Sequence, residues 1–272
     1  MMSAVWCNGE PADAAALSAA LVNYGHFTSL QVRDRAVQGL DLHLQRLVQA
    51  TGTLFGTTLD AQQVQRWMAH AVEHAGRADA SVRVTVFSRA FDFRDPLAAV
   101  PVDVLVAVGA PVQLAAARAV RSIGYQRELP ALKHVGTFGL FQQRRDAMAG
   151  GFDDALFLTA DGLVSEGTTW NVAFLDGEQL VWPQASALRG TAEALLQAHW
   201  EGPQVRRAYH AAELPTATAA FACNASGIWP LSGVDGRLLP DSDALAERAR
   251  GVMAAVAWQS LDEQAVPSRP PA

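Results

Sequence analysis

The sequence predicts an α/β protein of the α+β kind with two unequal domains, and three observations lead to this prediction. The chain has 272 residues, half of them hydrophobic, which is enough to bury one large or two moderate cores. The first half alternates apolar strand patterns with helical patterns. The second half contains many short apolar segments, and Asp-Gly pairs at residues 161–162, 176–177 and 235–236 predict tight turns there. We therefore expect a smaller N-terminal α+β domain and a strand-rich C-terminal domain.

The N-terminal domain is expected to span residues 1–112. Four strands are predicted, at residues 5–9, 27–32, 81–87 and 102–108. Apolar and β-branched residues dominate or alternate in each of them. Two helices are predicted, at residues 41–54 and 61–75. For the second helix Asp60 supplies an N-cap and Gly76 a stop signal.

The mixed, polar stretch at residues 113–130 is predicted to be a linker region, and the C-terminal domain is expected to span residues 131–272. Helices are predicted at residues 139–149, 190–200 and 241–258. Strands are predicted at residues 155–158, 163–165, 170–175 and 180–182. Short strands between tight turns are typical of a compact sheet domain.

Composition excludes several classes of protein. The net charge is −6 and the sequence has no basic blocks, which argues against nucleic acid as a partner. No stretch approaches the roughly 20 apolar residues that span a membrane. The first residues lack the pattern of a secretion signal, and Cys7 and Cys223 are the only cysteines. We expect a cytoplasmic protein that acts on small molecules and binds no metal.

Lys133 is the only lysine in the chain, because the other 20 of the 21 basic residues are arginines. Arginine cannot replace lysine where a deprotonatable primary amine must form an imine. Lys133 lies among apolar neighbours, between Pro130 and Gly136, and burial there would lower its pKa. The alternative is a surface lysine that survived a compositional bias by chance.

Glu166 follows 33 residues later, within the segment Val-Ser-Glu-Gly-Thr-Thr-Trp-Asn at residues 164–171. A carboxylate between two apolar strands can be aimed at a cationic partner such as a protonated pyridine nitrogen. The alternative is a solvated carboxylate in a turn.

Lys133 together with residues 151–172 resembles the signature of the class IV aminotransferases. These are the fold-type IV pyridoxal-phosphate enzymes, which include branched-chain and D-amino-acid aminotransferases and aminodeoxychorismate lyase. Four further segments resemble family motifs in the right order, at residues 24–30, 43–47, 188–191 and 223–225. The resemblance therefore covers most of the chain.

The resemblance implies the D-amino-acid aminotransferase-like fold, a pyridoxal 5'-phosphate cofactor and a homodimer. Lys133 would carry the cofactor as a Schiff base and move the proton, and Glu166 would hold the pyridine nitrogen. The remaining cofactor-binding residues would be Arg46, Gly190, Thr191, Asn224 and Ala225. A helix beginning at Gly190 would offer main-chain N–H groups to the phosphate. Arg189 stands where the family has proline, so the register at Thr191 could differ by one residue.

Three residues are candidates for substrate contacts. Arg83 lies on the polar face of a predicted strand and could bind a carboxylate, or could be an ordinary surface arginine. Thr28 and Phe138 stand where family aminotransferases usually have glutamate and tyrosine. The Phe-Thr-Ser segment, the Lys-His pair and Cys223-Asn-Ala resemble the lyase, but the Asn-Arg that follows Lys-His in the lyase is Gly136-Thr137.

Two reactions therefore stay open. The first moves an amino group between an amino acid or amine and a 2-keto acid, and we favour it. The second releases pyruvate and 4-aminobenzoate from aminodeoxychorismate. Two remoter alternatives are a zinc hydrolase that uses His70, Glu73 and His74, which match the H-x-x-E-H pattern, and a non-catalytic relative that only binds a ligand.

Overall fold

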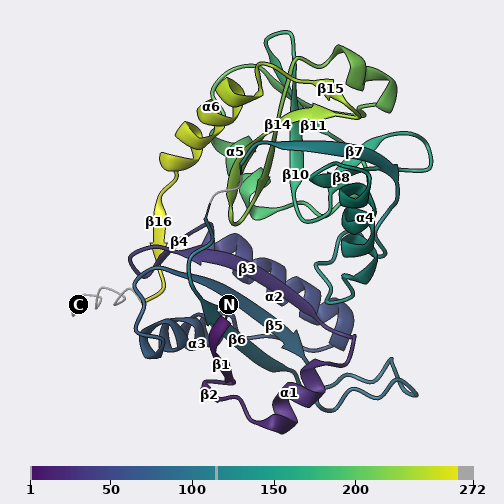
Figure 1. Ribbon diagram of the computed structural model, residues 1–272. Helices are drawn as coiled ribbons and strands as arrows, with labels where there is room; N and C mark the ends of the chain where they lie inside the picture. The colour runs from purple at the N-terminus through teal and green to yellow at the C-terminus, as the bar shows by residue number, and fades with distance from the viewer. Residues whose placement is uncertain (1, 114–115, 263–272) are drawn as a thin grey trace, which may run out of the picture. The chain divides into compact units, whose positions relative to one another are not determined.

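The computed structural model describes residues 2–113 and 116–262, which divide into two compact units. In the described chain, the first unit comprises residues 2–112 and 257–262, and the second comprises residues 113 and 116–256. Figure 1 shows the elements of both units, coloured along the chain. Each unit has its own sheet and its own hydrophobic core.

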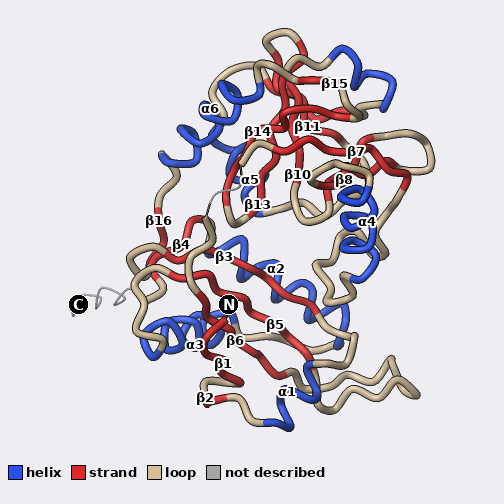
Figure 2. The backbone as a smooth tube through the Cα atoms, viewed as in Figure 1, coloured by secondary structure: helices blue, strands red, loops and turns tan. Residues whose placement is uncertain are grey.

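An antiparallel sheet forms the centre of the first unit, with the strand order β2-β1-β6-β5-β3. Its strands are β1 (Met2–Cys7), β2 (Glu10–Pro11), β3 (His26–Val32), β5 (Ala80–Phe87) and β6 (Asp103–Gly109). The helices of this unit are α1 (Ala14–Ala20), α2 (Leu40–Phe55) and α3 (Ala61–His74). Figure 2 distinguishes these helices from the strands by colour.

The ends of α2 and α3 follow from local sequence signals. The Asp60 carboxylate caps α3 by accepting hydrogen bonds from the N–H groups of Gln62 and Gln63, at 2.9 and 3.1 Å. Helix α2 ends at Gly56, whose φ of 62° lies in the left-handed region that glycine adopts without strain. These signals determine where α3 begins and where α2 ends. Within α2, His43 and Arg46 lie about one turn apart.

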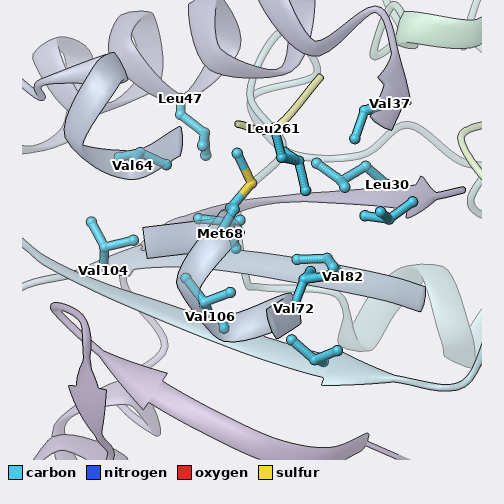
Figure 3. Close-up of a cluster of buried hydrophobic side chains, with 14 of the residues drawn as sticks. Leu30, Val37, Leu47, Val64, Met68, Val72, Val82, Val104, Val106 and Leu261 are labelled. Carbon is cyan, nitrogen blue, oxygen red and sulfur yellow. The ribbon is translucent and has the colours of Figure 1, made fainter. Parts of the chain in front are cut away.

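The core of the first unit lies between α2, α3 and one face of the sheet (Figure 3). Leu47 of α2 and Met68 of α3 pack with Val82 and Val106 of the central strands, and all four are at most 1% exposed. Because side chains alternate across a strand, the neighbouring residues of β3 and β5 point to the opposite face. That second face carries polar and charged side chains, among them Ser29 and Arg83, which are paired in register.

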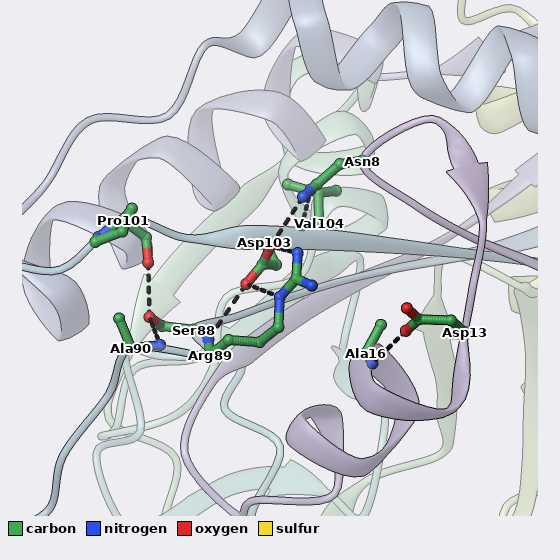
Figure 4. Close-up of polar contacts among 9 residues, drawn as sticks. All are labelled: Asn8, Asp13, Ala16, Ser88, Arg89, Ala90, Pro101, Asp103 and Val104. Atoms are coloured by element: carbon green, nitrogen blue, oxygen red, sulfur yellow. Dashed lines mark hydrogen bonds and ion pairs between the residues drawn. The ribbon is translucent and has the colours of Figure 1, made fainter.

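The connection between β5 and β6 is anchored at both ends by polar contacts (Figure 4). Asp103 accepts hydrogen bonds from the Arg89 guanidinium at 2.6 Å and from Asn8 Nδ2 at 2.8 Å. Ser88 Oγ donates to Pro101 O at 2.6 Å. These bonds hold the start of the connection against its end, so the long β5–β6 segment leaves the sheet at a fixed point.

A mixed sheet forms the centre of the second unit, with the order β12-β11-β10-β13-β14-β7-β8-β9 and β15 paired to β14. Its first strands are β7 (Arg118–Gly124), β8 (Asp154–Leu158), β9 (Val164–Gly167), β10 (Asn171–Asp176) and β11 (Gln179–Pro183). The later strands are β12 (Gln204–Arg207), β13 (Ala219–Asn224), β14 (Gly227–Val234) and β15 (Arg237–Leu238). Strand β7 runs parallel to both of its neighbours, whereas most other pairs are antiparallel.

Helices α5 (Thr191–His199) and α6 (Ser242–Ala254) pack on one face of this sheet, and α4 (Phe138–Ala149) packs on β8. A short 3₁₀ helix spans Ala211–Thr216. Leu196 of α5 and Phe221 of β13 are completely buried in the resulting core. None of the helices in the described ranges has the length and apolar character that crossing a membrane requires.

The structure differs from the sequence-based domain boundaries in two places. The predicted linker at 113–130 contains β7, an interior strand that only its main-chain pairing with β8 and β14 defines, since Arg and Ser interrupt its apolar pattern. The predicted helix at 241–258 ends at Ala254, and the chain then returns to the first unit. There β16 (Trp258–Ser260) pairs with β4 (Ala36–Gln38), and the side chain of Leu261 is buried in the core.

Candidate active site

Glu166 is one of the buried carboxylates of the second unit. It lies on β9 and is 4% exposed. The N–H of Leu188 donates a hydrogen bond to its carboxylate, and Arg127 Nη1 lies 3.9 Å from its Oε2. Arg127 is itself 5% exposed, and its Nε has no hydrogen-bond partner among the described residues. A buried ion pair of this length, with an unsatisfied donor beside it, leaves hydrogen-bonding capacity at the site.

Burial raises the pKa of Glu166 to about 7, because desolvation penalises the carboxylate. Arg127, the Leu188 N–H, Lys133 and Arg189 act in the opposite direction and lower it. The only lysine of the chain is therefore one of the charges that act on this carboxylate. A group that titrates near neutral pH among three cations is typical of a functional site.

Lys133 lies in an irregular segment between β7 and α4 and is half-buried. Two contacts fix this segment: Leu132 N–H donates to Leu129 O at 2.8 Å, and His134 Nε2 lies 2.9 Å from Glu128 O. Leu129 has a φ of 44°, which is uncommon for a side chain of its size. The chain thus turns sharply just before the lysine, and strained backbone of this kind clusters at functional sites.

Asp154, which is fully buried, holds the turn that joins β9 to β10. Asp154 accepts hydrogen bonds from Thr168 Oγ1 at 2.7 Å and from Trp170 Nε1 at 3.1 Å. Gly167 is required here, because a Cβ at this position would lie 1.9 Å from the ring of Trp170. The turn that follows Glu166 is therefore rigidly specified.

The same turn holds the segment that begins α5. Asn171 Nδ2 donates to Leu188 O at 2.7 Å, and Gly190 N–H donates to Asn171 Oδ1 at 3.1 Å. Gly190 is the N-cap residue of α5, and Thr191 is its first helical residue, buried at 7% exposure. The main-chain N–H groups at the start of this helix and the positive end of its dipole favour an anion.

Arg189, which precedes the N-cap of α5, and Glu193, in the first turn of α5, form a further charged pair. Arg189 Nη1 donates to Glu193 Oε1 at 2.9 Å, and its Nη2 donates to the carbonyl oxygens of Pro183 and Ala185. Glu193 is 1% exposed, and burial raises the pKa of its carboxyl group above the usual value. The arginine that replaces the expected proline therefore neutralises a buried acid at this helix end.

A third segment reaches the turn from the β13–β14 connection. Asn224 Nδ2 donates to Thr169 O at 3.1 Å, and Ser226 N–H donates to Asn224 Oδ1 at 2.8 Å. Ala225 lies between these two residues in the tight turn. Hydrogen bonds therefore connect three of the predicted cofactor-binding segments of the second unit, those at Glu166, Gly190 and Asn224.

Arg46 is a half-buried cation of the first unit, and its Nε atom is buried. It lies on α2, and its Nη2 donates to Thr28 Oγ1 and lies 3.2 Å from His43 Nδ1. Thr28 Oγ1 and His43 Nδ1 are 2.6 Å apart, and both residues are at most 2% exposed. Burial lowers the pKa of Arg46 to about 10, and its Nε has no hydrogen-bond partner in the described part of the chain. This guanidinium contacts a hydroxyl and an imidazole and has spare donor capacity for an anion.

Arg83 lies on the opposite face of the same sheet. Its guanidinium carbon is 3.6 Å from the centre of the Phe27 ring, and its Nε donates to Thr85 Oγ1 at 3.3 Å. Burial lowers its pKa, and stacking on an aromatic ring is a common way to orient an arginine. Ser29 is its register partner on β3.

Comparison with known proteins now adds to this geometry. The profile of the family described as amino-transferase class IV matches residues 25–234, which is most of the chain. The chain belongs to the class IV aminotransferase family. A search of curated proteins found no match.

Solved structures of class IV aminotransferases share the fold. The branched-chain aminotransferase of Escherichia coli superposes with a TM-score of 0.83 at 18% identity, covering 97% of this chain and 100% of that one. The branched-chain aminotransferase of Thermoproteus uzoniensis with norvaline gives 0.82 at 19% identity, covering 94% and 95%. A hypothetical aminotransferase from Mycobacterium tuberculosis in a PLP-bound form gives 0.76 at 22% identity, covering 94% and 99%. The predicted family and fold type IV are confirmed.

The three residues predicted for substrate contacts lie in different surroundings in this fold. Thr28 points into the core of the first unit, where its hydroxyl contacts His43 and Arg46, and a substrate contact by Thr28 stays a prediction. Ser29, one residue later, shares the face of Arg83 instead. Phe138 begins α4 with its side chain 81% exposed. Since side chains alternate along β3, a one-residue difference in register changes the face.

The alternative zinc site has no support in the described geometry. His70 and His74 lie one turn apart on α3 with ring centroids 3.9 Å apart, and His74 Nδ1 lies 2.9 Å from the main-chain oxygen of His70. Within residues 2–113 and 116–262 no group of three or more His, Cys, Asp or Glu side chains is arranged to hold a metal ion. The two histidines and Glu73 form a solvated helix face.

Sequence reasoning missed three residues of these clusters. Arg127 pairs with Glu166, Asn171 holds the start of α5, and His26 is buried beside Arg46 with its Nε2 3.0 Å from Thr51 Oγ1. Asn171 lies within residues 151–172, the segment that resembles the family signature, and this position is a usable signal. Arg127 lies in the segment predicted to be a linker, and His26 lies one residue before a predicted strand, so neither pattern indicates a partner.

Proposed function

We propose that this chain is a pyridoxal-phosphate-dependent aminotransferase that moves an amino group between an amino acid or amine and a 2-keto acid, with the cofactor held covalently by Lys133. Members of the family bind pyridoxal phosphate, and a solved relative is in a PLP-bound form. One observation carries the proposal: the only primary amine among the side chains is one of the charges acting on a buried carboxylate that titrates near pH 7.

The chemistry of the donors fits this cofactor. Glu166 is buried and already accepts the Leu188 N–H, and its remaining acceptor capacity suits a protonated ring nitrogen. Arg127 beside it keeps an unsatisfied Nε–H, which shows that the described residues leave this cluster incomplete. When bound, the cofactor supplies an electron sink for the bond broken at the substrate α-carbon.

Lys133 would have two tasks. Its Nζ would hold the cofactor in the resting enzyme, and after release by the incoming amine it would take the proton from the substrate α-carbon. A primary amine does this only in its deprotonated form. The Glu166 carboxylate would hold the proton on the ring nitrogen.

The phosphate would be held by neutral donors and one half-buried cation. The N–H groups at Gly190 and Thr191 begin a nine-residue helix, and the turn at Asn224 and Ala225 is hydrogen-bonded to the same cluster. Arg46 would add a charge-assisted hydrogen bond, which its unsatisfied Nε supports.

The substrate carboxylate is assigned to Arg83. Its guanidinium is oriented by the Phe27 ring and pairs with no described carboxylate, so it can donate hydrogen bonds to an α-carboxylate. The lyase alternative relied on the hydroxyls of Phe27-Thr28-Ser29, but the Thr28 hydroxyl is already bonded to His43 and Arg46. This observation favours amino transfer. We further propose a homodimer, as in the family.

Half-reactions test the proposal directly. Enzyme reconstituted with pyridoxal phosphate and mixed with single amino acids, without an acceptor, should lose its visible absorbance. Adding 2-oxoglutarate or pyruvate should restore it. Arg83→Ala should raise KM for amino acids roughly tenfold or more while leaving simple amine donors almost unaffected, because only the former carry a carboxylate. If no donor changes the absorbance, and aminodeoxychorismate yields 4-aminobenzoate and pyruvate without an acceptor, amino transfer is the wrong reaction.

A further inference from the structure

Asn171 is the first residue of β10, and both ends of its side-chain amide are bonded to the segment that precedes α5. Its Nδ2 donates to Leu188 O at 2.7 Å, and its Oδ1 accepts from Gly190 N–H at 3.1 Å. The residue is 5% exposed, so water does not compete for these bonds. Two bonds from one buried side chain fix both the position and the orientation of the main chain at 188–190.

Glu166 holds the same peptide from its other side. The Leu188 N–H donates to the Glu166 carboxylate, while the Leu188 carbonyl accepts from Asn171. Glu166 and Asn171 lie at the two ends of one turn, and Asp154 immobilises this turn through Thr168 and Trp170. Displacement of Leu188 would therefore break bonds at both ends of the turn.

Gly190 shows how closely the two segments approach. A Cβ on Gly190 would lie 2.4 Å from Asn171 Oδ1, well inside the contact distance of real atoms. The N-cap of α5 can therefore receive this side chain only because residue 190 is glycine. Its backbone φ of −77° is ordinary, so close approach, and not conformational freedom, is the reason for the glycine.

We infer that Asn171 is a positioning residue, which holds the Glu166 carboxylate and the first turn of α5 in fixed register so that the ring-nitrogen end and the phosphate end of one cofactor are bound together. The inference rests on the proposed function, because it concerns the same site. The inference goes beyond the proposed function because it assigns the spacing between the ring-nitrogen site and the phosphate site to Asn171, a side chain that would contact neither end of the cofactor.

Loss of Asn171 should change the titration of Glu166 in a defined direction. The charged groups that act on Glu166 are Arg127, Lys133 and Arg189, and the Leu188 N–H adds a neutral hydrogen bond. If Leu188 moves, this hydrogen bond weakens and the pKa of Glu166 rises further. Since the ionised carboxylate is the form that holds a ring proton, the acidic limb of the rate profile should move to higher pH.

The first test uses the protein without cofactor. In Asn171→Ala, amide hydrogen exchange in peptides covering residues 186–192 should accelerate about tenfold, because the Gly190 and Leu188 amides lose their acceptor or its position. Gln204→Ala is the matched control: its side-chain amide also makes one donor and one acceptor bond in this unit, to Gln197 O and from Trp182 Nε1. The control should leave residues 186–192 protected.

The second test uses the loaded enzyme. Relative to Gln204→Ala, Asn171→Ala should weaken pyridoxal-phosphate binding about tenfold and shift the acidic limb of the rate per bound cofactor upward. Asn171→Asp retains the acceptor for Gly190 N–H but loses the donor to Leu188 and adds a negative charge near Glu166, so its shift should be larger. Unchanged exchange at 186–192, or equal binding and pH profiles in Asn171→Ala and Gln204→Ala, would overturn the inference.

Failure of the proposed function looks different. A wild-type chain that gains no visible absorbance with pyridoxal phosphate contradicts the function while the exchange experiment still reports on Asn171. A wild-type chain that binds the cofactor, with an Asn171→Ala variant indistinguishable from it, contradicts the inference alone.

Discussion

Each unit holds a charged side chain with little access to water, Arg46 in the first and Glu166 in the second. The two side chains differ in the groups that surround them. In the first unit the Arg46 guanidinium contacts a hydroxyl and an imidazole, and it pairs with no described carboxylate. In the second unit the Glu166 carboxylate is acted on by three cations and a main-chain N–H. A poorly hydrated cation without an anion is costly in the protein alone, whereas a buried anion among cations is partly compensated.

Because of this difference, the two clusters are expected to gain from different parts of a ligand. The cluster around Arg46 has spare donors and gains most from an added anion, such as a phosphate. The cluster around Glu166 is balanced so that its pKa lies at about 7, and it gains most from a partner that brings its own proton. We therefore expect the first cluster to determine cofactor affinity and the second to determine the rate once the cofactor is bound.

The largest effect is expected from Glu166→Gln. Removing the charge beside the ring nitrogen should lower the rate per bound cofactor by roughly 10²–10³ while changing cofactor affinity far less. The same variant should stabilise the apoprotein at pH 8 by about 1–3 kcal/mol. The folded pKa of Glu166 is raised above its unfolded value, so stability falls as pH rises from about 4.5 to 7, and glutamine cannot ionise.

Rapid-quench rates at saturating cofactor and denaturant titrations at pH 5 and pH 8 measure the two effects. A variant with normal turnover would contradict the assigned role of Glu166. The same holds for a variant whose stability, compared with that of the wild type, is lower at pH 8 than at pH 5.

Arg46→Ala should have the opposite pattern and a smaller effect. Loss of a charge-assisted phosphate bond worth about 1.5–3 kcal/mol should weaken cofactor binding roughly 10- to 100-fold, with the rate per bound cofactor nearly unchanged. Equilibrium dialysis measures the affinity. Arg66→Ala, which removes an arginine that is more exposed and lies on the neighbouring helix α3, is the control and should bind normally. If Arg46→Ala binds as tightly as the control, the phosphate lies elsewhere.

His26 should make the first unit sensitive to acid. Burial, helped by Arg46, lowers its pKa to about 4, so the folded state holds fewer protons than the unfolded state between pH 4 and pH 6.5. Stability is therefore fully present above about pH 6.5 and is lost as pH falls, by up to about 3 kcal/mol at pH 4. His26→Gln should flatten this slope in denaturation curves. His199→Gln, at an exposed histidine, should keep it, and identical slopes in the two variants would contradict the assignment.

The smallest effect is expected from the double substitution of His70 and His74 by alanine. These histidines lie on the solvated face of α3, so turnover should be unchanged and stability should change by less than about 0.5 kcal/mol. Zinc content measured by atomic absorption should be the same before and after. A loss of turnover that follows a loss of zinc would revive the alternative that the geometry does not support.

Local patterns in the sequence account for much of the fold. The alternation in 81–87 and the capping residue Asp60 correspond to β5 and α3, because both signals act within a few residues. Strand β7 was not predictable, since its sequence is interrupted by Arg121 and Ser122 and its identity depends on strands distant in sequence. The return of the chain at Trp258 depends in the same way on pairing with β4.

In the candidate site, too, some features follow from the local sequence and others depend on residues distant in sequence. Lys133 and Glu166 stand out in the sequence because their chemistry is rare in their surroundings. The contacts made by Asn171 and Arg127 could not be predicted, because a hydrogen-bond partner is determined by tertiary packing. The sequence does not reveal which face of β3 carries Thr28, because apolar and polar residues do not alternate regularly along this strand. In the structure this face is the one that packs on α2.

The most direct test of the central claim is borohydride reduction of the enzyme loaded with pyridoxal phosphate, followed by peptide mass spectrometry. Lys133 is the only lysine, so the N-terminal amine is the sole competing amine in the chain. We predict one reduced adduct, on the peptide that contains Lys133, and loss of both adduct and visible absorbance in a folded Lys133→Ala variant. An adduct on the N-terminus, or full absorbance in Lys133→Ala, would contradict the account.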